Sequence, residues 1–269
     1  MKVGFIGAGN MAQAMFRRWI EQGKIAPASI YISELDASRR RSLQEQYGLQ
    51  VAQGNVDLVQ SVDVVILAIK PNQSDPVLDE IGPFAQGKSV LSVVTGLTTQ
   101  KLREKFPGAS VARIMPNTPA MVGEGVFAVS LEHTLSEDMA KWMQEILEAL
   151  GRVFFVAEKD MDAVVGISGS GPAYAFVMIE AMADAGVLQG LSRDLAYKLA
   201  AQTLVGAGRM VLEGGHPAAL KDAVSSPAGT TIEAIYSLEK NGFRYAVMDA
   251  VSVCTDKARS LRKAQESSK

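Results

Sequence analysis

Short runs of β-branched and apolar residues alternate with helical patterns from Lys2 to about Val156, and this alternation constrains the fold more than any other feature. The runs expected to form strands are KVGFI, SIYIS, DVVILAI, KSVLSVV, SVARIM, GVFAVS and RVFFVA. Helical patterns lie between several of them, at 11–22, 37–47 and 99–106. This order predicts a mainly parallel sheet that is covered on both faces. The last two strands are expected to extend that sheet, with 136–150 as another covering helix.

The strand pattern ends at about Glu158, and the remaining sequence consists of apolar segments with helical periodicity. We expect helices at 160–185, 193–212, 217–224, 230–240 and 244–264. The predicted fold class is therefore α/β, with a Rossmann-type, doubly wound, mainly parallel domain over 1–158 and an all-helical domain over 159–269. The helical part carries many Ala, Met and Gly residues and few charges, which favours a subunit interface. Packing within one chain is the alternative.

Composition disfavours several kinds of partner. The net charge is −2 and the densest basic cluster is 39–41, so neither a nucleic acid nor an anionic membrane is an expected partner. The start MKVGFIGAG lacks the pattern of a signal peptide, and no apolar run is expected to span a bilayer. Cys254 is the single cysteine and cannot form an internal disulfide, and we expect it to pack in a helix. These features predict a cytoplasmic protein that binds a small ligand and has no metal site.

The segment KVGFIGAGNMAQAM holds Gly7, Gly9 and Ala12 in the spacing G-x-G-x-x-A, between a predicted strand and a predicted helix. This context is typical of a dinucleotide-binding loop, and a plain strand-to-helix turn is the alternative. Gly7 permits the tight turn, and Gly9 lets a pyrophosphate approach the backbone. The N-terminus of the helix then supplies free N–H donors and a favourable dipole.

The second strand ends at Ser33, at the position where a dinucleotide fold meets the adenine ribose. An acid such as the following Glu34 usually accepts the 2′-hydroxyl of NAD, whereas a small hydroxyl with a nearby arginine suits the 2′-phosphate of NADP. This chain offers both, since arginines stand at 39–41 on the next helix. The residues alone leave the cofactor undecided, and a solvated helix face explains the arginines about as well.

Two more strand ends carry candidate ligand contacts. AIKPNQ places Ala68, Lys70 and Pro71 after the third strong strand, and VVTG ends the next strand with Thr95 and Gly96. The carboxyl ends of parallel strands share one edge of the sheet, where open α/β sheets bind their ligands. Taken singly, each is explained as well by an ordinary exit from a strand into a loop.

The segment GISGSGPAYA bears on the kind of substrate. It matches the glycines of the G-x-x-G-x-G-x-x-x-K helix start of β-hydroxyacid dehydrogenases, but Ala175 stands where those enzymes carry the lysine that handles an alcohol proton. An imine has no need of that lysine, because its nitrogen arrives protonated and the cationic C=N group accepts hydride readily. His133 and His216 are expected at the surface and do not restore an alcohol mechanism.

Six segments, in this order, resemble pyrroline-5-carboxylate reductase over nearly the whole chain: MKVGFIGAGNMA, LAIKPNQ, RIMPNTPA, GISGSGPAYAF, EAMADAGVLQGL and LKDAVSSPAGTTIEAI. The resemblance implies that NAD(P)H reduces 1-pyrroline-5-carboxylate to L-proline, in the last step of proline biosynthesis. It also implies a domain-swapped homodimer through the helical domain, often assembled into a ring of dimers. NADPH is the commoner donor in the family, and Glu34 keeps NADH open as an alternative donor.

The resemblance further implies where the ligands bind. An acid that matches Glu158 lies near the nicotinamide, at the domain junction, and a threonine that matches Thr231 lies closest to the ring nitrogen of the substrate, as the expected catalytic residue. The expected substrate-binding residues are Val224, Ser226, Gly229, Thr230, Thr231 and Ile232. With the strand ends above, the expected cofactor-binding residues are Ile6, Gly7, Ala8, Gly9, Asn10, Met11, Ser33, Asn55, Ala68, Ile69, Lys70, Pro71, Thr95, Gly96 and Glu158.

The segment SSPAGTTIEAI places small and hydroxylated residues before a predicted helix. Thr230 and Glu233 are expected to form a capping box, which leaves the N–H groups of Thr231 and Ile232 free for a carboxylate. Ala228 departs from the glycine that many family members have there. If that position needs a positive φ, alanine costs of order 1 kcal/mol.

Two alternatives to this function stay open. The first is a reductase of a related cyclic imine, such as the six-membered homologue. The second is a regulatory protein that binds NADPH without turnover, against which the intact substrate loop argues.

Overall fold

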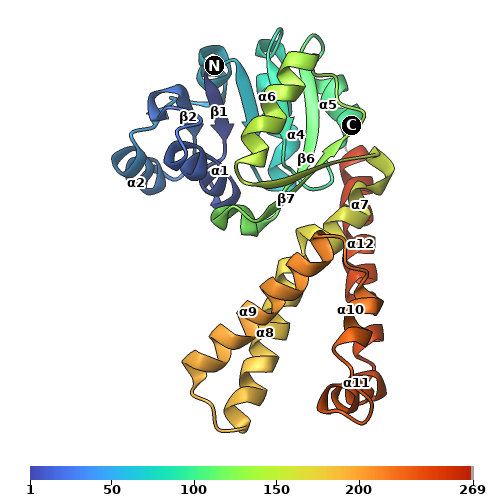
Figure 1. Ribbon diagram of the computed structural model, residues 1–269. Coiled ribbons are helices and arrows are strands. Elements are labelled where there is room, and N and C mark those ends of the chain that lie inside the picture. Colours follow the sequence, from blue (N-terminus) through green and yellow to red (C-terminus); the bar gives the residue numbers. More distant parts are fainter. Residues whose placement is uncertain (268–269) are drawn as a thin grey trace. The chain divides into compact units, whose positions relative to one another are not determined.

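The computed structural model describes residues 1–267, which form two compact units (Figure 1). The first unit combines Met1–Ser170 with the C-terminal segment from Val253, and the second is Gly171–Ser252. The first unit extends past the boundary at 158/159 that the sequence predicts. Met161 and Val165 belong to it because they share a small apolar core with Met115, Ala128 and Ala258. The domain boundary drawn from the sequence stays a prediction, and the end of the last helix belongs to the compact unit that holds the sheet.

Eight strands form one sheet in the order β3-β2-β1-β4-β5-β6-β7-β8. Neighbours run parallel except for β6 and β7, which pair antiparallel. The mainly parallel sheet and its extension by the last two strands are confirmed, while the two-residue β3 is too short to show a periodicity. The strands are β1 (Val3–Ile6), β2 (Ile30–Ser33), β3 (Gln50–Val51), β4 (Val64–Leu67), β5 (Ser89–Ser92), β6 (Ser110–Met115), β7 (Gly125–Ser130) and β8 (Gly151–Val156).

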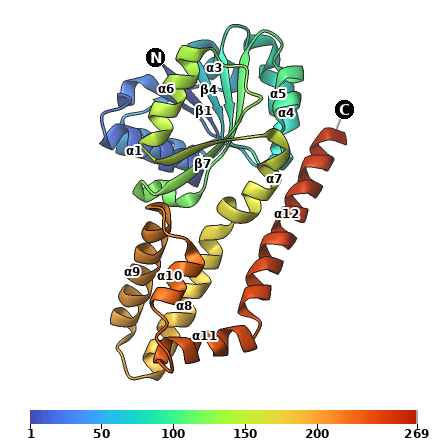
Figure 2. The same cartoon turned by 45° about the vertical axis from the view of Figure 1, so that its right-hand side comes forward.

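Helices cover both faces of the sheet, and each face has its own apolar core. Figure 2 shows α1 and α6 on one side of the strands and α4 and α5 on the other. Successive residues of a strand point to opposite faces, so Val3 and Phe5 face α1 while Ile6 joins the core of α3, α4 and α5. The helices of this unit are α1 (Asn10–Glu21), α2 (Ala37–Tyr47), α3 (Asn55–Ser61), α4 (Ser74–Ile81), α5 (Thr99–Lys105), α6 (Glu137–Glu148) and α7 (Met161–Val164).

The second unit is helical, as predicted, but it buries little apolar surface by itself. In α8 the residues Phe176 and Val177 are 63% and 66% exposed, and Leu188 is 82% exposed. An amphipathic helix needs a covering surface to bury such residues, so these helices present an unburied apolar area. The helices are α8 (Gly171–Leu188), α9 (Arg193–Leu212), α10 (Pro217–Ala223), α11 (Thr230–Lys240) and α12 (Phe243–Ser267), the last of which ends in the first unit.

The segment predicted as a single helix over 160–185 is interrupted. A π-helical turn at Val165–Gly169 separates α7 from α8, and the N–H of Ser170 donates to the carbonyl of Val165 at 2.9 Å. π-helical turns of this kind often occur at functional sites. The periodicity of apolar residues continues through the turn, which is why the sequence does not show it.

The helical run Glu158–Leu188 is long and apolar enough to cross a membrane, by length and composition. This differs from the expectation that no apolar run is long enough. Length and composition are weak evidence on their own, because a helix covered by other protein passes the same test.

Candidate active site

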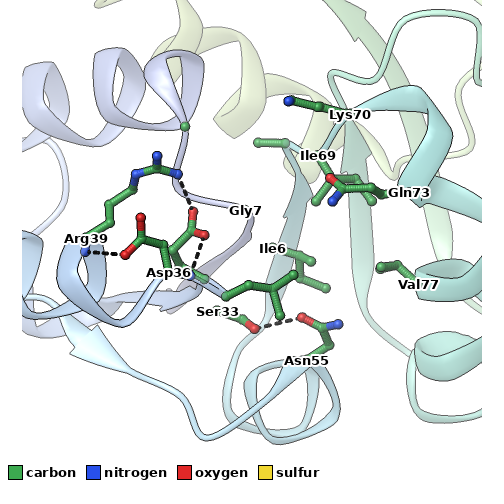
Figure 3. A pocket seen from close by; sticks show the side chains of 14 residues that line it. Ile6, Gly7, Ser33, Asp36, Arg39, Asn55, Ile69, Lys70, Gln73 and Val77 are labelled. Atoms are coloured by element: carbon green, nitrogen blue, oxygen red, sulfur yellow. Dashed lines mark hydrogen bonds and ion pairs between the residues drawn. The ribbon is translucent and has the colours of Figure 1, made fainter.

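An open pocket of about 370 Å³ lies at the carboxyl ends of β1, β2 and β4 (Figure 3). The chain places β2 and β3 on one side of β1, and β4 and the later strands on the other, so the strand order reverses here. Open α/β sheets bind ligands at such a point. The lining residues are Ile6, Gly7, Gly9, Ser33, Glu34, Leu35, Asp36, Arg39, Asn55, Ala68, Ile69, Lys70, Gln73 and Val77.

The two loop glycines have different roles. Gly7 has a φ of +86°, and a Cβ there would lie 2.6 Å from the carbonyl oxygen of Ala68. Gly9 has an ordinary φ of −74°, and a Cβ there would meet nothing within 4 Å. Gly7 is therefore required by the fold, whereas Gly9 opens the loop toward the pocket. Gly9 is also the N-cap of α1 and provides no side-chain cap, so the first N–H groups of that helix have no partner within it.

The side chains of Ser33 and Asn55 form a hydrogen-bonded pair in the part of the pocket next to the carboxyl end of β2. The hydroxyl of Ser33 donates to Oδ1 of Asn55 at 2.7 Å, as Figure 3 shows, and Nδ2 of Asn55 donates to Glu80 at 2.7 Å. Both Ser33 and Asn55 line the pocket. A hydroxyl and an amide that hold each other in this way are oriented for a ribose or a phosphate group.

The carboxylate of Glu34 binds back onto the glycine-rich loop. It accepts the N–H of Ala8 and the N–H of Asp36, each at 3.0 Å, and Nη1 of Arg39 at 3.1 Å. Partial burial raises the pKa of Glu34, but the N–H groups of Asp36 and Ala8 and the Arg39 guanidinium outweigh it, so the pKa lies below its usual value. The group is therefore ionised at neutral pH.

Pro71, at the exit of β4, is tied to the end of α12. Its carbonyl accepts hydrogen bonds from Ser74 at 2.8 Å and from Nε2 of Gln265 at 2.6 Å, and Ser74 also donates to Gln265. Gly96, after β5, packs close to the same helix, since a Cβ there would lie 3.2 Å from the backbone nitrogen of Arg262. The C-terminal part of the last helix therefore packs against the loops of Pro71 and Gly96, both of which are predicted to bind the cofactor.

Glu158 accepts hydrogen bonds from three side chains of the first unit. The hydroxyls of Ser130 and Thr99 donate to it at 2.6 and 2.7 Å, and the fully buried Arg113 donates at 2.7 Å. Burial raises the pKa of Glu158, but these three donors lower it below its usual value. Arg113 also forms an ion pair with Asp162, at 3.9 Å. The sequence does not predict this role of Arg113, because its partners are distant along the chain.

The structure brings part of the predicted cofactor set together. It also adds residues that the predicted set lacks, since Leu35, Gln73 and Val77 line the pocket. The remaining predicted residues lie close in sequence to lining residues or at other strand exits, and their role stays a prediction. Lining the pocket are Ile6, Gly7, Gly9, Ser33, Asn55, Ala68, Ile69 and Lys70; not lining it are Ala8, Asn10, Met11, Pro71, Thr95, Gly96 and Glu158.

The expected capping box at the start of α11 is wrong. The helix begins at Thr230 with Gly229 as its N-cap, and no side chain caps it. A tight turn sets this start: the N–H of Gly229 donates to the carbonyl of Ser226 at 3.0 Å, and a Cβ on Gly229 would lie 2.3 Å from the Ser226 hydroxyl. Thr230 is one residue too late to act as the cap. The N–H groups of Thr230, Thr231 and Ile232 therefore have no acceptor within the helix.

The loop before α11 contains a strained residue. Among the described residues, Ala228 is the one non-glycine residue with a positive φ, of 54°. Alanine in this left-handed conformation costs of order 1 kcal/mol relative to glycine. The sequence leaves the sign of φ at this departure from the family pattern open, and the structure shows that it is positive.

Replacement of Ala228 by glycine is expected to raise the free energy of unfolding by about 1 kcal/mol, because glycine adopts this φ without strain. Thermal unfolding followed by circular dichroism measures the change. The matched control is Ala234→Gly in the middle of α11, which is expected to lower stability by about 1 kcal/mol. Equal losses at both positions would show that Ala228 is not strained.

The sheet and its pocket define a Rossmann-type dinucleotide-binding protein. Residues 2–96 match the family described as NADP oxidoreductase, coenzyme F420-dependent, and residues 158–261 match that of pyrroline-5-carboxylate reductase dimerisation. The chain is 41% identical over 264 residues to a pyrroline-5-carboxylate reductase from Synechocystis, which covers 98% of this chain and 99% of the relative. It belongs to the pyrroline-5-carboxylate reductase family.

Other relatives give the same result. The enzyme of that name from Escherichia coli is 40% identical over 265 residues, which cover 97% of this chain and 98% of the relative. The crystal structure of Plasmodium falciparum pyrroline carboxylate reductase with NADP bound has a TM-score of 0.89 and 34% identity, with 97% of this chain and 98% of that chain covered. Both units of this chain are therefore represented in its relatives.

Proposed function

We propose that this protein reduces 1-pyrroline-5-carboxylate to L-proline, with NADPH as the hydride donor and NADH as an accepted substitute. The full-length relatives of this name support the reaction, and the relative solved with NADP supports the cofactor. The observation in this chain that carries the proposal is the uncapped start of α11, which follows a loop of small and hydroxylated residues.

The pocket of the first unit fits a dinucleotide. Gly9 leaves open space beside the uncapped N-terminus of α1, where the pyrophosphate has N–H donors available. Ser33 and Asn55 would hold the adenosine ribose or its phosphate, and Ala68 to Lys70 would line the path toward the nicotinamide. NADPH, when bound, supplies a hydride from its nicotinamide ring.

The start of α11 supports a site for the substrate carboxylate. Three N–H groups point out of the first helical turn, and the positive end of the helix dipole lies behind them. Gly229 keeps the turn tight enough for an anion to approach. The hydroxyl of Thr231 would then bind the ring nitrogen and hold the protonated imine in place. The side chain of Ala175 cannot exchange a proton, which agrees with a substrate that is already cationic.

The helical unit supports assembly as a homodimer. The family match to a dimerisation domain covers 158–261, and the exposed apolar residues of α8 lie within it. We propose that a second copy covers these residues in a domain-swapped arrangement, and that dimers assemble further into a ring. Such an enzyme would work in the cytoplasm on a small molecule, without nucleic acid or membrane as partner.

Substitution of Thr231 by alanine is expected to raise KM for the imine several-fold and to lower kcat modestly, because a neutral hydrogen bond contributes about 1 kcal/mol. Thr231→Ser keeps the hydroxyl and is expected to retain nearly the parent kcat/KM. Steady-state kinetics of both variants measure the effect. Equal kcat/KM for the alanine variant and the parent protein would remove Thr231 from the site.

The size of the substrate ring tests which imine is the substrate. We expect kcat/KM to be higher for the five-membered 1-pyrroline-5-carboxylate than for its six-membered homologue, measured with the same NADPH concentration. A higher value for the six-membered ring would assign the protein to the related reaction instead.

A further inference from the structure

The end of β2 in this chain differs from a simple phosphate site, because a partly buried carboxylate occupies it. Glu34 directly follows Ser33, and its side chain is 11% exposed. It is held by the N–H groups of Ala8 and Asp36 and by Arg39, three donors in all. A carboxylate fixed from three sides keeps its charge and its position in the pocket.

This carboxylate engages two donors that a phosphate would otherwise use. Ala8 stands between the two loop glycines, so its N–H belongs to the set of donors that faces an anionic ligand. Arg39 is the cation among the lining residues nearest to Ser33 in sequence, and Glu34 already forms an ion pair with it. The positive charge that suits a 2′-phosphate is therefore neutralised within the protein.

A second carboxylate adds to the negative charge at the same end. Asn55 accepts the Ser33 hydroxyl at its Oδ1 and donates an N–H of its Nδ2 to Glu80. Glu34 therefore follows Ser33 in the chain and pairs with Arg39, while Glu80 accepts a hydrogen bond from Asn55. A 2′-hydroxyl can donate a hydrogen bond to Glu34, whereas a 2′-phosphate dianion meets like charge.

We propose that Glu34 determines the cofactor specificity of this protein: its carboxylate holds Arg39 and penalises the 2′-phosphate, so that NADH binds nearly as well as NADPH. Arg39 acts as a latent phosphate ligand, which becomes available when the carboxylate charge is removed. The inference rests on the proposed dinucleotide cofactor and not on the identity of the imine.

Fluorescence titrations of NADPH and NADH, without imine substrate, test the proposal. For the parent protein we expect the two Kd values to lie within about tenfold of each other. In Glu34→Gln, which keeps an acceptor for the N–H of Ala8 but loses the charge, the ratio of Kd for NADH to Kd for NADPH is expected to rise about tenfold or more. Glu34→Ser is a second variant, in case the glutamine variant does not fold.

Two controls separate this effect from a general change in charge. Glu45→Gln removes a carboxylate from the exposed side of α2, outside the pocket, and is expected to leave the ratio unchanged. Arg39→Gln is expected to have little effect in the parent protein and to abolish most of the gain in the Glu34→Gln background. Competition by 2′,5′-ADP and 5′-AMP, which differ by the 2′-phosphate alone, measures the same preference without a nicotinamide.

An unchanged ratio in both folded Glu34 variants would overturn the proposal, as would a parent protein that binds NADPH a hundredfold more tightly than NADH. Because these are binding measurements, a lack of imine reduction would refute the proposed reaction and leave this inference intact. Conversely, a protein that reduces the imine but shows an unchanged ratio would refute only the role of Glu34.

Discussion

Replacement of Gly7 by alanine is expected to weaken NADPH binding by at least about a hundredfold and to lower the stability of the first unit. The added Cβ would lie 2.6 Å from the carbonyl oxygen and 3.0 Å from the carbonyl carbon of Ala68, and both are backbone atoms. The positive φ of this residue adds strain of roughly 1 to 2 kcal/mol for any side chain. The ends of β1 and β4 must therefore separate, which opens the centre of the pocket.

Gly9→Ala is the matched control for this prediction. Its Cβ meets no protein atom within 4 Å and its φ is ordinary, so we expect a much smaller loss of stability than for Gly7→Ala, limited to the poorer N-cap of α1. The added methyl group occupies the space proposed for the pyrophosphate, so binding of NADPH is still expected to weaken. Titration and thermal unfolding of both variants check the pair. If Gly9→Ala bound NADPH as tightly as the parent protein, the phosphate would not approach this loop.

Replacement of Arg113 by methionine is expected to lower the free energy of unfolding by about 3 kcal/mol. Arg113 is fully buried, and its removal leaves the carboxylates of Glu158 and Asp162 without their shared cation. The remaining donors to each carboxylate keep the loss at the lower end of the usual range. Urea unfolding followed by tryptophan fluorescence reports on the first unit, where Trp19 and Trp142 both lie.

A double variant separates loss of charge balance from loss of packing. Glu158→Gln in the Arg113→Met background removes one of the uncompensated charges, so it is expected to recover part of the lost stability. The ion pairs of Arg113 would not stabilise the fold if the losses of unfolding free energy of the two variants were additive. The same conclusion would follow if Arg113→Met lowered the free energy of unfolding by less than about 1 kcal/mol.

Much of the fold is predictable because its signals are local. The alternation of strands and helices gives the sheet, and Gly7 with Gly9 gives the loop at its centre. The end of α12 cannot be assigned to the first unit in this way, because nothing near Val253 in the sequence marks contacts with Pro71 and Gly96, which are far along the chain.

The site is predictable where one residue type fits one backbone position. At Ala228 the sequence raises the question, since many family members have glycine there, and the structure answers it with a φ of 54°. The capping box fails for a related reason: Thr230 and Glu233 have the right spacing, but the turn from Ser226 to Gly229 moves the start of the helix back by one residue. The preference of threonine for the N-cap position is therefore overridden here by the geometry of the turn that precedes the helix.

The contact between Glu34 and Ala8 shows a further limit. The sequence places an acid after β2, and it indicates a possible ribose ligand, but it does not show that the carboxylate binds the glycine-rich loop and Arg39 at the same time. Such a contact depends on the register of β1 against β2, which aligns Ile6 with Ser33. Side-chain partners across neighbouring strands follow from the assembled sheet.

The most direct test of the proposed function follows the absorbance of NADPH at about 340 nm in the presence of 1-pyrroline-5-carboxylate, with L-proline quantified in the same reaction. The account predicts that NADPH is consumed in proportion to the proline formed, and that omission of the imine stops its consumption. A folded protein that binds NADPH but forms no proline from 1-pyrroline-5-carboxylate would contradict it.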